Sequence, residues 1–172
     1  RCPSRARAAE AGLIAVLSSF VMVLFGFGSG FMGNPHPSDV VVAFKTLIAT
    51  FLAPSLIEEI NFRALMIRRS HGYVAVTPEK DESLPAPDPD KLQDDAAPQR
   101  PPVLEQVCYL VVFVVYHLDA LHNYPLFRDV RFLVIALMMG MACQEMLLRS
   151  GSIWPGVILH WLCVFGWKTF LL

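Results

Sequence analysis

The sequence GLIAVLSSFVMVLFGFGSGFM at residues 12–32 runs without a single charged side chain. A helix that crosses a bilayer needs about 20 predominantly apolar residues, so this stretch predicts a transmembrane helix. The whole chain has the same character, because 55% of its 172 residues are hydrophobic and only 17% are charged. Its mean hydropathy is +0.49, which is too apolar for an ordinary water-soluble domain.

Four further apolar stretches lie at residues 40–67, 103–118, 130–148 and 153–172. The first of these is longer than one bilayer crossing and contains Pro54, so it is either one kinked helix or two. Counted once, it brings the total to about five spans. We expect an all-α, polytopic transmembrane helical bundle. Gly26 and Gly30 form a GxxxG pattern, which predicts a close contact with another helix.

Between the apolar stretches, residues 70–102 are rich in Pro, Asp, Glu, Gln and Lys. Such a segment buries too little apolar surface to fold, and we interpret it as a long disordered loop. The chain then divides into an N-terminal flank with the first helix at residues 1–39 and a core at residues 40–172, which this loop interrupts.

Lys and Arg residues concentrate in alternate connections. Most of them lie in the N-terminal flank, in the loop and its edges, or at Arg149, whereas the opposite side has only Arg128, Arg131 and Lys168. The positive-inside rule places the N-terminus and the loop in the cytoplasm, or in the stroma or matrix of an organelle. The sequence does not distinguish the endoplasmic reticulum, plasma and organellar membranes. A net charge of −1 predicts no nucleic-acid partner.

The four cysteines show neither a CxxC pair nor the spacing of a zinc finger. Three of them, Cys108, Cys143 and Cys163, lie inside apolar stretches, and Cys2 precedes the first. Free cysteines of this kind behave as small apolar residues, so we expect them in the core.

Three ionisable residues, Glu58, Glu59 and Arg63, interrupt the second apolar stretch. Each costs at least about 2.5 kcal/mol in the hydrocarbon region unless it is paired. Glu59 and Arg63 stand at i and i+4 and can form an ion pair. Glu58 points about 100° away from Glu59, and a desolvated carboxylate suits a general base. An ion cluster that only links helices is the structural alternative.

Two histidines in apolar stretches, His117 and His160, can complete a site. Counted from the inner face, Glu58, His117 and His160 lie about 16, 20 and 12 Å deep. The three side chains therefore share one layer of the membrane. His122 falls beyond the end of its span, where we expect a loop.

The ordered set Glu58-Glu59-Ile60-Asn61-Phe62-Arg63, Phe113-Val114-Val115-Tyr116-His117 and His160 resembles the motifs EExxxR, FxxxH and a C-terminal histidine of one family. This is the CAAX prenyl protease and bacteriocin-processing family, also called CPBP or Abi, and the resemblance covers roughly residues 45–172. It implies an intramembrane endopeptidase embedded in lipid, which hydrolyses a membrane-associated protein or peptide, with or without a prenyl group.

The resemblance also implies roles for individual residues. Glu58 is then the general base that activates water, His117 is its partner, and His160 stabilises the oxyanion. Glu59, Arg63 and Phe113 support these three. No metal or other cofactor is required by this scheme.

The chain departs from the family pattern at Val164, where the family has Asn or Asp four residues after the last histidine. Losing one oxyanion donor typically costs about 10²- to 10³-fold in rate. The alternative function is therefore a catalytically impaired relative that acts as a membrane scaffold or binding protein.

Two other kinds of site use buried ionisable residues, a catalytic zinc site and an ion path. Glu58, His117 and His160 form a legitimate His2Glu ligand set for catalytic zinc. No HExxH motif for a zinc protease and no GxGD pair for an aspartyl protease occurs in the sequence. A small transporter or channel subunit predicts polar residues along a whole helix face, and the spans show no such stripe.

Overall fold

The computed structural model describes residues 5–65, 100–118 and 125–171, and these are helical with short connections and no strand. The helices are α1 Arg5–Gly28, α2 Val40–Thr50, α3 Ile57–Glu59, α6 Val103–His117, α7 Val130–Ser150 and α8 Trp154–Gly166. Three π-helical segments continue them: η1 Phe51–Leu56, η2 Ile60–Leu65 and η4 Trp167–Leu171. A 3-10 turn, Pro125–Arg128, precedes α7. The predicted all-α fold is confirmed.

Within the part of the chain that the structure describes, three helical segments are long and apolar enough to cross a membrane: Arg5–Gly28, Val40–Arg63 and Val130–Ser150. The shorter apolar helix α6 and the continuous pair α8–η4 correspond to the other two predicted spans. The chain is an integral membrane protein built as a helical bundle. Residues 70–99 of the predicted loop lie outside the described residues, as does His122.

The second span is one kinked segment that contains α2, η1, α3 and η2. Its bend lies at Ala53, which has extended backbone angles (φ −140°, ψ 123°) directly before Pro54. A residue before proline disfavours the α conformation, so the helix cannot run straight through this point. At its start, the Asp39 side chain accepts hydrogen bonds from the backbone N–H groups of Val41 and Val42, as an N-cap does.

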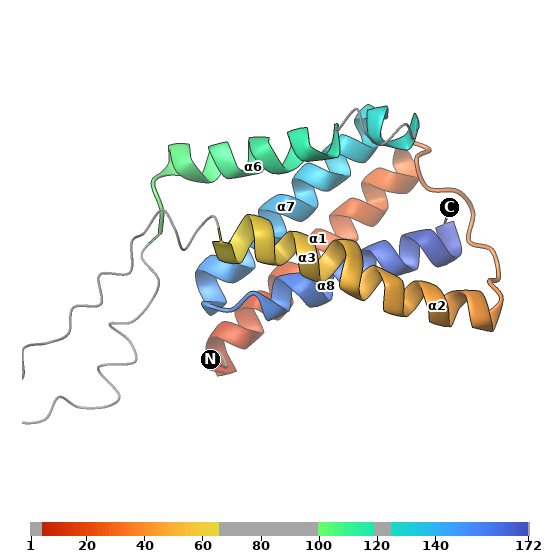
Figure 1. Cartoon of the computed structure of the whole chain (residues 1–172), viewed down its shortest axis with the longest axis horizontal. Coiled ribbons are helices and arrows are strands. Elements are labelled where there is room, and N and C mark those ends of the chain that lie inside the picture. Colours follow the sequence, from red (N-terminus) through yellow and green to blue (C-terminus); the bar gives the residue numbers. More distant parts are fainter. Residues whose placement is uncertain (1–4, 66–99, 119–124, 172) are drawn as a thin grey trace, which may run out of the picture.

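Helix α7 lies at the centre and packs against α1, α6 and α8 (Figure 1). Its buried face is rich in small and flexible residues, among them Ala136, Gly140, Ala142, Cys143 and Met146. Small side chains let neighbouring helices approach closely, which is how membrane helices gain packing energy.

Figure 1 shows how the ends of the helices are distributed along the bundle. The start of α1, the end of η2, the start of α6 and the α7–α8 turn lie toward one end, and the C-terminus lies at the other. Successive spans therefore run in alternate directions through the bundle, as the positive-inside argument assumes. Which end faces the cytoplasm, stroma or matrix stays a prediction.

The first helix ends at Gly28, four residues before the predicted boundary at Met32. Gly30 has a positive φ of 69°, and the N–H groups of Phe31 and Met32 both donate to the Gly26 carbonyl, at 2.9 and 3.0 Å. The chain thereby turns back, and Met32 covers Gly26. The predicted GxxxG helix contact is wrong, because Gly30 lies outside the helix.

The cysteines are not all core residues. Cys143 is buried and Cys163 is half-buried, whereas Cys108 on α6 is exposed. The core prediction is therefore wrong for Cys108, because an apolar stretch in a membrane protein does not distinguish the bundle side of a helix from its lipid side. Cys2 lies outside the described residues.

Candidate active site

The kinked second span presents one buried stripe to the bundle. Its members, spaced at i, i+3, i+4, i+7 and i+8, are Ser55, Glu58, Glu59, Phe62 and Arg63. Ile57 and Asn61, on the other side, are exposed. This spacing is that of a single helix face. Both carboxylates and the guanidinium are therefore turned away from lipid.

Arg63 ties Glu59 to two neighbouring helices. Its Nε lies 3.6 Å from Glu59 Oε2, with both side chains 1% exposed. Nη2 donates to the backbone carbonyl of Gly140 on α7 at 3.2 Å, and the guanidinium stands over the Phe113 ring of α6, 4.6 Å from its centroid. The expected ion pair is present, and a cation–π contact adds to it. Arg63 thus positions the Glu59 carboxylate.

His160 on α8 contacts both carboxylates. Its Nδ1 lies 3.2 Å from Glu59 Oε1, and its Nε2 lies 3.8 Å from Glu58 Oε2. An ionised carboxylate can only accept a hydrogen bond, so Nδ1 carries a hydrogen and donates it to Glu59. That contact orients the ring and leaves Nε2 directed at Glu58.

His117, at the end of α6, approaches Glu58 from the other side. Its Nε2 lies 3.6 Å from Glu58 Oε2, while its Nδ1 lies 2.8 Å from the Phe113 backbone carbonyl one turn earlier. A carbonyl has no hydrogen to give, so Nδ1 must be the donor. In the neutral ring, Nε2 is then a free acceptor that faces Glu58.

Glu58 Oε2 is therefore the point where the site converges. It lies 3.6 and 3.8 Å from two imidazole Nε2 atoms, it is buried, and it has no hydrogen-bond partner among the described residues. Separations of this size are longer than direct hydrogen bonds. At these distances a water molecule or a substrate atom can bridge the carboxylate and the imidazoles, which do not hydrogen-bond to each other directly.

Two glycines allow the helices to come this close. A Cβ added at Gly156 on α8 would lie 3.2 Å from Glu59 Oε2 and 3.3 Å from the Cβ of Cys143. One added at Gly140 would lie 3.0 Å from the Phe113 ring. Both contacts are tighter than most side chains tolerate. The site therefore depends on the absence of a side chain at Gly140 and at Gly156.

The structure brings together all six residues expected at the site: Glu58, Glu59, Arg63, Phe113, His117 and His160. Sequence reasoning missed Gly156 and Cys143, which lie beside Glu59, and Gly140, which lies against the Phe113 ring. The small residues repeated along residues 136–143 were a usable signal for a close helix contact. Nothing in the local sequence marked Gly156.

A zinc site would use the same carboxylate and histidines. Among the described residues, no group of three or more His, Cys, Asp or Glu side chains is arranged to hold a metal ion. The expectation that the site works without a metal stays a prediction.

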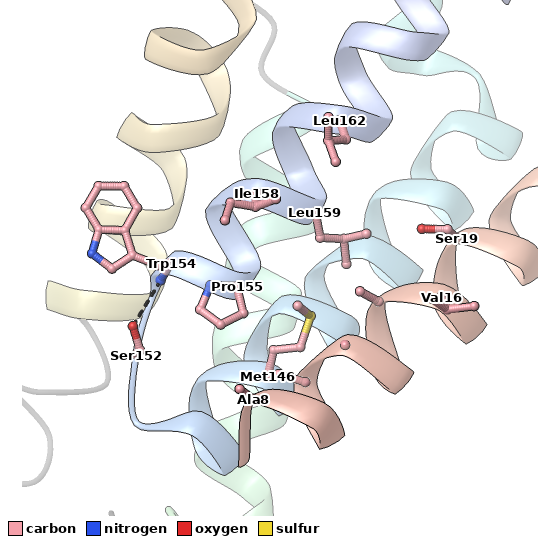
Figure 2. A pocket seen from close by; sticks show the side chains of 13 residues that line it. Ala8, Val16, Ser19, Met146, Ser152, Trp154, Pro155, Ile158, Leu159 and Leu162 are labelled. Atoms are coloured by element: carbon pink, nitrogen blue, oxygen red, sulfur yellow. Dashed lines mark hydrogen bonds between the residues drawn. The ribbon is translucent and has the colours of Figure 1, made fainter. Parts of the chain in front are cut away.

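An apolar groove lies on a different face of α8 (Figure 2). It has a volume of about 780 Å³ and runs between α1 and α8, lined by residues such as Ala8, Val16, Met146, Leu159 and Leu162. Leu159 faces this groove, whereas the next residue, His160, contacts the carboxylates. The only hydroxyls in its lining are those of Ser19 and Ser152. The groove therefore lacks the groups that hydrolysis needs.

A family model described as type II CAAX prenyl endopeptidase Rce1-like matches residues 40–166. This range includes every residue of the cluster and leaves out α1. No curated protein and no solved structure matches the chain.

Proposed function

Since the chain belongs to the type II CAAX prenyl endopeptidase Rce1-like family, we propose that its buried Glu–His cluster hydrolyses a peptide bond of a prenylated, membrane-associated substrate. The observation that carries the proposal is the convergence of two imidazole Nε2 atoms on Glu58 Oε2, at 3.6 and 3.8 Å. Family membership supports a membrane endopeptidase in general. The residue roles below are our proposal.

Glu58 and His117 activate the water. Glu58 Oε2 and the free Nε2 of His117 are both hydrogen-bond acceptors, so a water molecule between them donates to both. As its oxygen attacks the carbonyl carbon of the substrate, one proton moves to Glu58. The same carboxyl later gives this proton to the leaving amine, which is general acid–base catalysis by a single group.

His160 stabilises the charge that develops on the carbonyl oxygen. Its Nδ1 is held by Glu59, and an imidazolium presents a second N–H at Nε2, toward the space beside Glu58. The geometry favours this donor, because the His160 ring lies between two carboxyl groups, 3.2 Å from Glu59 Oε1 and 3.8 Å from Glu58 Oε2. A fixed donor at the oxyanion lowers the barrier.

The test is cleavage of a prenylated CAAX peptide by the purified protein in detergent. We expect Glu58→Ala and His117→Ala each to lower kcat by about 10²- to 10⁴-fold, the usual contribution of general acid–base groups. Glu10→Gln is the matched control, because Glu10 is an exposed carboxylate at the start of α1, 55% exposed. A Glu58→Ala protein that cleaves as fast as wild type would refute the assignment.

A second candidate function is that of a catalytically impaired scaffold, which Val164 favours. Val164→Asn distinguishes the two. A wild-type protein as inert as Glu58→Ala, together with activity in Val164→Asn, supports the scaffold. Activity in wild type that a chelator leaves unchanged removes the zinc alternative.

A further inference from the structure

Ser55 is a buried hydroxyl that no part of the proposed mechanism uses. Its side chain is 0% exposed, and its Oγ has no hydrogen-bond partner among the described residues. Leaving a buried hydroxyl unpaired costs about 1–3 kcal/mol. The Ser55 hydroxyl can recover this cost by binding a polar atom of a bound substrate.

Ser55 lies on the buried stripe between the two carboxylates. Leu56 and Ile57, which follow it, have α-helical backbone angles. At about 100° per residue, Ser55 stands about 60° from Glu58 and about 40° from Glu59, in the angle between them. Its hydroxyl therefore faces the same space as their carboxylates, one turn along the helix.

The same argument places Ser55 opposite His160. Segment η1 packs against α8. The Phe51 ring contacts the Trp161 ring, with centroids 5.2 Å apart, and Glu59 contacts His160 at 3.2 Å. Ser55 is four residues from each of these contacts, and both reach one turn of α8. It therefore lies where the kinked span crosses the turn that carries His160.

We propose that Ser55 donates the second hydrogen bond to the oxyanion of the tetrahedral intermediate, beside His160. The inference rests on the proposed function and deepens it. When water attacks, the C=O π pair moves onto oxygen, and the Ser55 O–H and the His160 N–H point at it. No proton leaves Ser55. When the C–N bond breaks, the carbonyl re-forms and the amine takes its proton from Glu58.

This assignment explains how a site with Val164 can still hold an oxyanion. The side chain of Val164, one turn after His160 on α8, has no hydrogen-bond donor. A hydroxyl supplied by the kinked span meets the need from the facing helix. Preorganised donors of this kind are among the largest contributors to catalysis.

Other buried side-chain atoms without a hydrogen-bond partner among the described residues are Glu58 Oε2, Gln144 Oε1, Arg63 Nε and Nη1, Trp167 Nε1 and Thr169 Oγ1. The Glu58 and Gln144 oxygens are acceptors, and the Arg63 guanidinium pairs with Glu59 at 3.6 Å. Trp167 and Thr169 follow His160 by seven and nine residues, about 10 Å or more along the axis. The Trp167 ring is also stacked on Phe31, with centroids 5.5 Å apart. Their distance from His160 makes them controls rather than rivals.

The experiment compares Ser55→Ala, Ser55→Thr, Val164→Asn and the double variant Ser55→Ala/Val164→Asn with wild type and Glu58→Ala, on the prenylated CAAX peptide. We expect Ser55→Ala to lower kcat by about 10²-fold with KM little changed, because the donor acts only on the oxyanion. Ser55→Thr keeps the hydroxyl and retains more activity. Val164→Asn in the Ser55→Ala background restores kcat. Thr169→Val, which removes a matched buried hydroxyl, leaves kcat unchanged.

A second readout is binding of a peptide phosphonate, an analogue of the tetrahedral intermediate. Ser55→Ala weakens its affinity about as much as it lowers kcat and leaves affinity for the uncleaved peptide unchanged. Unchanged kcat in Ser55→Ala, or a loss that Val164→Asn does not restore, overturns the Ser55 proposal alone. Wild type no more active than Glu58→Ala overturns the proposed function as well.

Discussion

The bundle contains two groups of ionisable side chains that differ in burial and in geometry. The buried cluster, consisting of Glu58, Glu59, Arg63, His117 and His160, has contacts of 3.2 to 3.8 Å between side chains at most 10% exposed. The end network, consisting of Glu10, Arg100, Glu145 and Arg149, lies where α1, α6 and α7 begin or end. In it, Glu145 accepts from Arg100 and Arg149 at 2.7 Å each.

The end network has the shorter contacts, but we expect it to contribute less to stability than the buried cluster. Arg100 and Arg149 are 56% and 42% exposed, and exposed ion pairs gain little because water and salt screen them. In the buried cluster, a charge without a partner is not solvated by water, so its desolvation is not compensated. Its longer separations leave room for the atoms of a substrate. Distance alone is thus a poor guide to the weight of an ion pair.

The largest expected effect on stability comes from Arg63→Met. It leaves Glu59 as a buried carboxylate without its cation, and breaking a buried pair in this way costs about 3–5 kcal/mol. Thermal unfolding in detergent measures the change. Arg149→Met in the end network is the matched control, for which we expect a much smaller shift. Equal shifts in the two variants would break the distinction between the two groups.

A smaller effect is expected from Gly156→Ala. The new methyl group would stand 3.2 Å from Glu59 Oε2 and 3.3 Å from the Cβ of Cys143, so α8 and these neighbours have to move apart by a few tenths of an ångström, and we expect a cost of about 1–3 kcal/mol. Because His160 moves with α8, peptidase activity should fall together with the unfolding temperature. Gly12→Ala is the control, since no atom lies within 4 Å of its Cβ position. If both variants behave alike, close packing is not what positions His160.

The smallest effect is expected from Glu145→Gln. This change removes the acceptor that Arg100 and Arg149 share, and the pairs are exposed enough for salt to screen. We expect a slight fall in unfolding temperature at low ionic strength, none at high ionic strength, and unaltered cleavage. A loss as large as that of Arg63→Met would show that the end network is shielded from water.

Several parts of the fold followed from local pattern alone. Apolar length predicted the spans, and depth along each helix predicted that Glu58, His117 and His160 share one layer. The predictions that failed concern sidedness and helix ends. The prediction for Cys108 failed because apolarity does not distinguish the lipid-facing side of a helix from its core side, and Cys108 is exposed. The prediction for Gly30 failed because its backbone is left-handed, so it lies outside the helix.

The sequence by itself determined which residues can do chemistry, since a buried Glu–Glu–x–x–x–Arg and two histidines have few other uses in an apolar helix. It also determined that Glu59 and Arg63 share a face, because helix geometry relates residues along one helix. Only the tertiary structure decided that both Nε2 atoms meet at Glu58 Oε2 and that Gly140 and Gly156 leave room for Phe113 and Glu59. Distances between helices depend on how side chains far apart in the sequence pack, and no single helix carries that information.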